Sequence, residues 1–456
     1  MGFLRFQRSL HVQIHTKGNI ERRSDWESFL IRFSEMFFLF LLLRIGEGKP
    51  TILISSDGFR WDYLGRTSTP GLDKIKSTGV HAKNLINTFA TVTFPNHYTM
   101  ATGLYQESHG IIDNEMFDPE FNETFDMSNV DPKWWSGGEP IWKTAEKAGI
   151  KSVCVNWVGC PVEGQRPAIW NAYDGSISYN DRVDKVVDAL ESGSATLGLL
   201  YFEEPDHSCH IHGTESQEVT SAILRVDRAI QRLLSRIDLN KVNVIFTADH
   251  GGVDVGNDKI VVLENFSNID FRLPSGGAVA HVWPTRVTDT EQLVADLASI
   301  PSSQANCYPR DQVPARLHYS NNRRIAPVVC IAELGWTLLR SQAAAESYSL
   351  KGSHGYDATL DENNPMRPVF LASGPDFVHQ DDPVDPFTNV DLFPLVAELI
   401  GLDERFFPPI NGSIDGIRES LLASHTPRHR NESDAISLAL GFTLPQEFVV
   451  ALIERV

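Results

Sequence analysis

The chain has 456 residues and contains little cysteine and few basic residues. Its five cysteines are too few for a disulfide scaffold, and no pair has the spacing of a zinc ribbon. Lys and Arg number 40 against 59 Asp and Glu, a formal net charge of −19. This acidic excess argues against binding of polymeric nucleic acid or of broad anionic membrane surfaces. One small anion is still allowed where a local positive charge is supplied.

The cysteines leave two interpretations open. Cys154 and Cys160 are close enough in sequence to form a disulfide bond, but buried free thiols fit equally well. The redox state of Cys307 and Cys330 stays open as well, and Cys209 is expected to pack in the interior.

The chain also lacks a long apolar run near its N-terminus. Residues 36–43 are uniformly apolar, but eight residues are too few to cross a bilayer. The run has the length of a signal-peptide core, although about 35 residues precede it. We therefore expect export, to a periplasmic, extracellular or membrane-anchored location. A buried strand or helix is the alternative, so a cytoplasmic location and a peripheral membrane association stay open.

The remaining sequence has the pattern of a large α/β protein. Hydrophobic residues make up 42% and charged residues 22%, which is ordinary for a globular core. Apolar runs of strand length alternate with helical patterns, which is typical of a mostly parallel sheet with helices on both faces. We expect an N-terminal extension (1–47), one catalytic domain (48–423) and a linker with a short tail (424–456). The predicted strands are residues 51–54, 152–155, 197–202, 242–247 and 368–372, and the clearest predicted helices cover residues 219–237 and 390–399.

Metal-ligating side chains follow three of these strands directly. Asp57 follows the first strand, Asp206 and His210 follow the third, and Asp249 and His250 follow the fourth. The carboxyl ends of parallel strands meet at one edge of a sheet, so we expect these side chains to converge there. Taken singly each signal is weak, since Asp57-Gly is a common turn. Together with His354, which lies between glycines, they give three Asp and three His, a donor set that suits two zinc ions.

Thr93 is the candidate nucleophile. Pro95 suits the first turn of a helix, which places Thr93 at a helix N-terminus, where the dipole favours an alkoxide and an anionic substrate. Metal coordination would activate this weak nucleophile. A helix-capping role for Thr93 is the structural alternative.

Several ordered motifs make the chain resemble the nucleotide pyrophosphatase/phosphodiesterase family of the alkaline phosphatase superfamily. The resemblance covers residues 49–422. Its motifs are Asp57-Gly-Phe-Arg60, Thr93-Phe-Pro-Asn-His-Tyr98, Glu204-Pro-Asp206 with His210, Asp249-His-Gly251, His354-Gly-Tyr-Asp357 and His318-Tyr-Ser-Asn-Asn-Arg-Arg324.

The resemblance implies an alkaline-phosphatase-like fold with a bimetal site at the carboxyl edge of the sheet. It implies one zinc ion held by Asp206, His210 and His354, and a second held by Asp57, Asp249 and His250 that also binds the Thr93 oxygen. Asn114 would donate its side-chain amide to a phosphate oxygen. Phe94 and Trp170 would hold a nucleobase, with core packing as the alternative.

The implied activity is zinc-dependent hydrolysis of phosphodiester and pyrophosphate bonds of nucleotides and related diesters. It would proceed through a covalent phospho-threonine intermediate and release a nucleoside 5′-monophosphate. A lipid- or choline-headgroup phosphodiesterase on the same fold is the first alternative, and an inactive binding protein is the second. The physiological substrate and the oligomeric state do not follow from the sequence.

Overall fold

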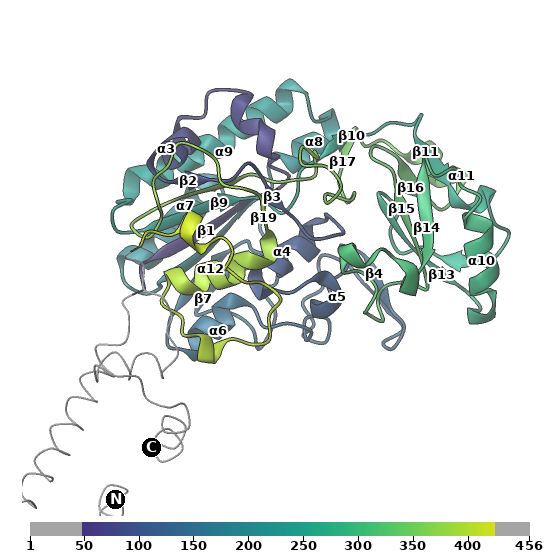
Figure 1. The fold of residues 1–456 in the computed structure, drawn as a ribbon, viewed down its shortest axis with the longest axis horizontal. Helices are drawn as coiled ribbons and strands as arrows, with labels where there is room; N and C mark the ends of the chain where they lie inside the picture. The colour runs from purple at the N-terminus through teal and green to yellow at the C-terminus, as the bar shows by residue number, and fades with distance from the viewer. Residues whose placement is uncertain (1–47, 425–456) are drawn as a thin grey trace, which may run out of the picture. The chain divides into compact units, whose positions relative to one another are not determined.

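The computed structural model describes residues 48–424 and is built around one seven-stranded sheet (Figure 1). Five neighbouring strands run parallel, the sixth runs antiparallel beside them, and the strand at that edge pairs antiparallel with the sixth. Parallel strands joined by crossover helices are the predicted α/β architecture, and this prediction is confirmed. The strand order is β2 (Val80–His81), β18 (Phe370–Ser373), β9 (Asn243–Thr247), β1 (Thr51–Ser56), β8 (Leu197–Phe202), β6 (Ser152–Val155) and β7 (Ile169–Asn171).

The predicted strands all exist, but one runs in the unexpected direction. The runs at 51–54, 152–155, 197–202 and 242–247 coincide with β1, β6, β8 and β9, which are parallel. The run at 368–372 becomes β18, which pairs antiparallel with both β9 and β2. A strand buried on both faces is apolar throughout in either direction, so its composition cannot reveal its orientation.

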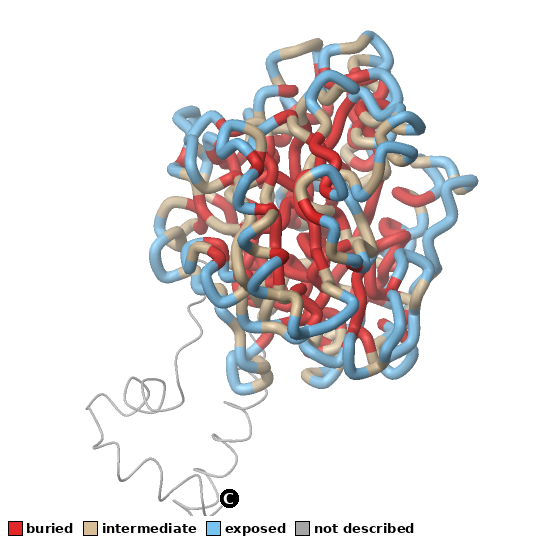
Figure 2. The backbone as a smooth tube through the Cα atoms, turned by 90° about the vertical axis from the view of Figure 1, so that its right-hand side faces the viewer, coloured by how far each residue is buried: buried red, intermediate tan, exposed pale blue. Residues whose placement is uncertain are grey.

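Helices cover both faces of the sheet (Figure 1). Along β1, Ile52 and Ile54 face one helical layer and Leu53 faces the other, as the two-residue strand period requires. Figure 2 shows that buried backbone fills the interior of this sandwich while exposed segments surround it. The first layer contains α3 (Pro70–Thr78), α7 (Tyr179–Glu191) and α9 (Gln217–Arg236), and the second contains α4 (Thr93–Thr102), α6 (Ile141–Lys147) and α12 (Leu392–Leu399).

Helix α9 confirms the prediction made for residues 219–237. The Ser216 side chain accepts a hydrogen bond from the N–H of Val219 and caps the helix. Its apolar side is buried against the sheet, and its basic side faces α7. There Arg232 Nε lies 3.0 Å from Asp184 Oδ1, and Arg236 Nη2 lies 2.6 Å from Glu191 Oε2. The predicted helix at 390–399 is also present, as α12 preceded by a short 3₁₀ turn, Asn389–Asp391.

An additional region lies beside the main sheet and packs around its own core. Its antiparallel sheet has the order β12 (Phe271–Arg272), β13 (Val279–Pro284), β15 (Val328–Ala332) and β14 (Ala305–Pro309), and α10 (Thr290–Leu297) packs on it. A disulfide bond joins Cys307 on β14 to Cys330 on β15. A second bond joins Cys154 to Cys160, which decides between the two interpretations left open for that pair.

The motif around Arg324 connects this region to the main domain. Arg324 is buried, and its Nε lies 2.8 Å from Asp118 Oδ2 on β4 (Met116–Asp118). Its Nη1 donates to the carbonyl oxygens of Gly110 and Trp134, at 2.6 Å and 2.8 Å. A buried guanidinium with this many acceptors holds two loops of the main domain against the segment that connects β14 to β15.

The predictions for the chain ends lie outside the described residues. These are the apolar run at 36–43 and the linker and tail beyond residue 424. Among residues 48–424, no helix is both long enough and apolar enough to cross a membrane.

The central strand gives a first test of this packing. Leu53 on β1 is fully buried against the layer of α4 and α12. Replacing Leu53 with Ala should lower the free energy of unfolding by about 2–5 kcal/mol, through lost burial and a residual cavity. Urea denaturation followed by tryptophan fluorescence measures this change. Val287→Ala, at a side chain that is 83% exposed, should change it by less than about 0.5 kcal/mol. Equal effects of the two changes would contradict the assigned core.

Candidate active site

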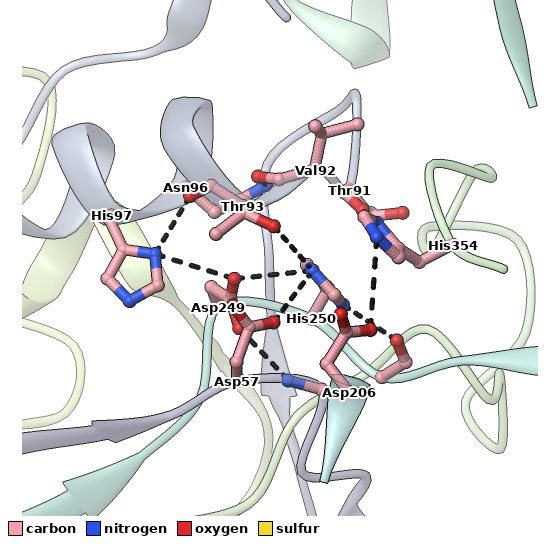
Figure 3. A network of polar contacts seen from close by, with 12 residues as sticks. Asp57, Thr91, Val92, Thr93, Asn96, His97, Asp206, Asp249, His250 and His354 are labelled. Carbon is pink, nitrogen blue, oxygen red and sulfur yellow. Dashed lines mark hydrogen bonds and ion pairs between the residues drawn. The ribbon is translucent and has the colours of Figure 1, made fainter. Parts of the chain in front are cut away.

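The predicted ligands converge on the carboxyl edge of the main sheet (Figure 3). Asp57 follows β1, Asp206 begins α8 (Asp206–His212) after β8, and Asp249 and His250 follow β9. Two main-chain contacts join these loops: the N–H of Asp206 donates to Asp57 O at 3.0 Å, and the N–H of Gly58 donates to Asp249 Oδ1 at 3.2 Å. Gly58 has a φ of +66°, and a Cβ there would lie 2.8 Å from Asp206 Cβ. Only glycine allows the approach of these two loops.

Asp57, Asp249 and His250 form one group of candidate metal ligands, and all three are buried. His250 Nε2 lies 3.3 Å from Asp57 Oδ1 and 3.2 Å from Asp249 Oδ2. This group contains the three residues that the resemblance assigned to one zinc ion.

The remaining predicted ligands lie beside that group. His210 Nε2 is 3.1 Å from Asp206 Oδ2, and His354 Nε2 is 3.9 Å from Asp206 Oδ1. Within the described residues, however, the compact set around Asp206 contains His250 and His354 instead of His210. The rings of His250 and His354 stack with centroids 3.6 Å apart, so His250 lies at the junction of the two sets.

All three histidines are oriented by main-chain carbonyl oxygens. The Nδ1 atoms of His210, His250 and His354 lie 2.8 Å, 2.7 Å and 2.9 Å from the oxygens of Gly352, Gly251 and Thr91. A carbonyl oxygen can only accept, so each Nδ1 carries the proton. Each Nε2 is therefore the ring nitrogen that faces the carboxylates, and it offers a metal-binding lone pair whenever the ring is neutral.

The electrostatics of the site favour a bound cation. Burial, together with the neighbouring Asp249 and Asp206, holds the pKa of Asp57 well above its usual value. Burial also raises the pKa of Asp249. Asp57 Oδ1 and Asp249 Oδ2 are buried without a hydrogen-bond partner in the described part of the chain. Buried carboxylates that repel one another and present free oxygens are what a divalent cation stabilises.

The histidines complete a donor set suited to such a cation. Burial lowers the pKa of His250 to about 4 and that of His354 to about 3, so both rings are neutral at pH 7. His210 differs, because the Asp206 carboxylate raises its pKa to about 9. Burial disfavours the charged form of Asp206, but His210 outweighs this effect and the pKa of Asp206 is lowered. Mixed carboxylate and imidazole donors fit zinc better than magnesium or calcium.

Thr93 faces this cluster from the first turn of α4. Its Oγ1 lies 3.3 Å from His250 Nε2 (Figure 3). Val92 is the N-cap residue of α4, and Thr93 is the first helical residue. The capping role considered for Thr93 is therefore wrong.

Asn114 contacts the residue that follows Thr93 and belongs to the loop that precedes β4. Its Oδ1 accepts a hydrogen bond of 2.9 Å from the N–H of Phe94. Since the first N–H groups of a helix have no intrahelical partner, this bond satisfies one of them. It also fixes the amide orientation, so the NH₂ group of Asn114 is left as a donor next to Thr93.

The two predicted base-binding residues have different surroundings. Phe94 is partly buried, and one side of its ring packs near Phe125 and Trp135, each with a centroid distance of 6.2 Å. Trp170 is 38% exposed on the edge strand β7, where the Arg166 guanidinium lies 4.6 Å from its ring centroid. The structure shows no contact between Trp170 and the metal-ligand cluster in the described residues.

Tyr173 is an aromatic residue near the site that sequence reasoning missed. It is 58% exposed, and its ring lies 6.2 Å from that of Tyr201, whose hydroxyl donates to Asp57 Oδ2 at 2.6 Å. In the sequence, the feature that pointed to Tyr173 was its position three residues after Trp170, as a second aromatic side chain.

Cys209, adjacent to His210 in sequence, is a free buried thiol. It packs against Gly352 and Gly252, where a Cβ at position 352 would overlap both its sulfur and its carbonyl oxygen. This contact confirms the expectation that Cys209 packs in the interior.

The comparisons with known proteins agree with this geometry. The sequence profile of the type I phosphodiesterase / nucleotide pyrophosphatase family matches residues 51–357. The chain therefore belongs to that family of enzymes, which are phosphoric diester hydrolases.

Curated and solved relatives resemble most of the chain. Human ectonucleotide pyrophosphatase/phosphodiesterase family member 5 is 34% identical over 413 residues, covering 88% of this chain and 84% of the relative. A bis(5′-adenosyl)-triphosphatase of Xenopus laevis is 34% identical over 400 residues, covering 86% and 85%. The solved human family member 5 superposes with a TM-score of 0.76 at 34% identity, covering 82% of this chain and all of that chain.

Asp57 offers a test of the repulsion within the site. Its raised pKa means that the ionised form is less favourable in the folded than in the unfolded chain. Above that pKa, ionised Asp57 therefore destabilises the metal-free protein. Asp57→Asn should raise the melting temperature of the chelator-treated protein, by roughly 1–2 °C per kcal/mol of repulsion removed. It should also reduce the rise in melting temperature that added Zn²⁺ produces.

Differential scanning fluorimetry with chelator and with Zn²⁺ measures both effects. Asp258→Asn, at an exposed carboxylate, is the matched control and should alter neither value. A lower melting temperature for metal-free Asp57→Asn would contradict the proposed repulsion.

Proposed function

We propose that the chain hydrolyses phosphodiester and pyrophosphate bonds of nucleotides and related diesters, with Thr93 as the nucleophile and two zinc ions as cofactors. The observation that carries this proposal is the position of the Thr93 hydroxyl. It lies at the N-terminus of α4, 3.3 Å from the Nε2 atom of a histidine in the buried carboxylate cluster.

Seven side chains would hold the metal ions. Asp206, His210 and His354 would hold one ion, while Asp57, Asp249 and His250 would hold the other together with the oxygen of Thr93. The free carboxylate oxygens, and the orientation of the histidines through their Nδ1 atoms, support this assignment. When bound, the ions supply Lewis-acid stabilisation of the charge that develops on the bridging oxygens.

Thr93 and Asn114 then carry the chemistry that belongs to the chain. The Thr93 hydroxyl gives its proton to solvent, and its oxygen attacks phosphorus, forming an O–P bond as the bond to the leaving oxygen breaks. The leaving group takes a proton from solvent. Water cleaves the phospho-threonine, releases the monoester and restores the hydroxyl, so two in-line displacements give net retention at phosphorus. The Asn114 amide, held by Phe94 N–H, donates to a phosphate oxygen throughout.

The substrate class is supported by the relatives. The murine family member 5 has been solved as an inactive threonine-to-alanine variant in complex with AMP, and a frog relative is a bis(5′-adenosyl)-triphosphatase. We propose a nucleoside 5′-monophosphate as one product here. The exposed part of Phe94 is one candidate contact for the base. Trp170 on β7 and Tyr173, just after that strand, are two others.

Export is part of the proposal. Two disulfide bonds in the described residues favour an oxidising compartment, and one relative is a venom phosphodiesterase of Crotalus adamanteus. Residues 48–423 would form the catalytic domain, which the family match over residues 51–357 supports.

A substrate panel tests the reaction class. Zinc-loaded protein should release p-nitrophenol from thymidine 5′-monophosphate p-nitrophenyl ester and AMP from diadenosine triphosphate, with products identified by mass spectrometry. It should act at least about 10-fold more slowly on glycerophosphocholine, which corresponds to about 1.4 kcal/mol of transition-state discrimination. A preference for glycerophosphocholine would instead support the choline-headgroup alternative, and activity on neither ester would support an inactive binding protein.

The nucleophile is tested separately. Thr93→Ala should reduce turnover by at least about 1,000-fold, because no other group replaces the attacking oxygen. The metal content should stay near that of the unaltered protein, since six other ligands remain. Thr93→Ser retains a hydroxyl and should restore part of the activity. Full activity in Thr93→Ala would exclude Thr93 as the nucleophile.

A further inference from the structure

Tyr201 makes the shortest hydrogen bond to a candidate metal ligand at this site. It lies in β8, is almost fully buried, and donates its hydroxyl to Asp57 Oδ2 at 2.6 Å. A bond of this length to a carboxylate is a strong, charge-assisted hydrogen bond. It occupies one oxygen of Asp57 and leaves Oδ1, the oxygen 3.3 Å from His250 Nε2, without a partner.

His97 stands in a similar relation to Asp249. Its Nδ1 lies 2.8 Å from the carbonyl oxygen of Thr93 and 3.4 Å from Asp249 Oδ2 (Figure 3). The carbonyl oxygen can only accept, so Nδ1 carries a proton. His97 thus donates this N–H to the main chain of the nucleophile, and the same nitrogen lies 3.4 Å from the carboxylate oxygen that faces His250.

The other ring nitrogen of His97, Nε2, has no hydrogen-bond partner within residues 48–424. It is buried, and the ring packs edge-on against Trp157 at 5.1 Å. A fully buried ring with one polar anchor has its orientation fixed by packing. This ring therefore cannot turn to release Thr93 or Asp249 without disturbing the aromatic residues around it.

Tyr201 and His97 also contact each other. Their rings are 5.0 Å apart at an angle of 80°, an edge-to-face arrangement. The two side chains that contact the carboxylates of Asp57 and Asp249 therefore also pack against each other. The three candidate ligand histidines are instead oriented by main-chain carbonyl oxygens that accept from their Nδ1 atoms. Side-chain substitution can remove the support of the carboxylates without altering that of the histidines.

We propose that Tyr201 and His97 are positioning residues for the metal ion held by Asp57, Asp249 and His250. Tyr201 sets which oxygen of Asp57 faces the ion, and His97 sets the position of Asp249 relative to Thr93. The inference rests on the proposed function, since it requires a metal ion at this group. Replacing a residue that orients a metal ligand in this way typically lowers metal affinity by about 10–100-fold.

Tyr201→Phe removes only the hydroxyl that bonds Asp57. We expect it to lower the zinc affinity of one of the two sites by about 10–100-fold, while the affinity of the other site stays unchanged. Bound metal is measured by mass spectrometry after equilibration with zinc at graded chelator concentrations. Tyr63→Phe is the matched control, because Tyr63 is also buried and donates to a backbone carbonyl, that of Thr214 at 3.4 Å, outside the site. It should leave both zinc affinities unchanged.

Two substitutions at His97 separate positioning from packing. Asn offers an N–H near the place of Nδ1, whereas Leu fills space without a donor. His97→Asn should bind zinc at the site of Asp57, Asp249 and His250 more tightly than His97→Leu does. In protein loaded with Co²⁺, Tyr201→Phe and His97→Leu should shift the visible absorption of one site, and His97→Asn should shift it less. A purely structural role would not move this absorption.

The outcomes distinguish the two proposals. If the unaltered protein binds two zinc ions and all variants bind them with equal affinity and equal Co²⁺ spectra, the positioning role is wrong while the proposed function stands. If the unaltered protein binds no metal, the proposed function fails and this inference fails with it. Should Tyr201→Phe not fold, the comparison of His97→Asn with His97→Leu decides the question by the same measurements.

Discussion

The structure is organised around the mutual repulsion of carboxylates gathered at one buried edge of the sheet. Asp57, Asp206 and Asp249 follow neighbouring strands. Asp57 and Asp249 are buried and Asp206 is partly buried, so little water is left to screen their charges. Two divalent ions would outweigh three carboxylates by about one unit charge. A chain with a net charge of −19 can therefore offer a local attraction to a phosphodiester. The acidic composition and the anionic substrate are compatible because the positive charge is concentrated at one place.

The fold serves this arrangement through strand order. β8, β1 and β9 are adjacent and parallel, so their carboxyl ends deliver three loops to the same position. Hydrogen bonds donated by main-chain N–H groups then join the loops, and Gly58 permits their contact. The nucleophile comes from α4 on one face of the sheet, and His354 arrives from the chain that leaves the additional antiparallel region. The site thus combines the carboxyl edge of the sheet with helix α4 and with the segment that carries His354.

Much of this was predictable because it is local in sequence. Apolar runs followed at once by Asp or His marked both the strands and the ligands, as at Asp57 and Asp249. The direction of β18 was not predictable, since a doubly buried strand has the same composition in either direction. The Cys307–Cys330 bond and the contacts of Tyr201 and His97 join residues far apart in the chain. Such pairings depend on how the elements pack, which no single segment of the sequence encodes.

The return of the chain at His354 has a consequence for biosynthesis. His354 is made almost 300 residues after Asp57, and the whole antiparallel region is made between them. At typical translation rates, roughly 15–60 s separate the two residues. During that interval the growing chain gains Asp206 and Asp249, which complete the three carboxylates, but it still lacks the imidazole of His354. Completion of the site is thereby tied to completion of the domain, so an incomplete nascent chain cannot assemble the full metal centre.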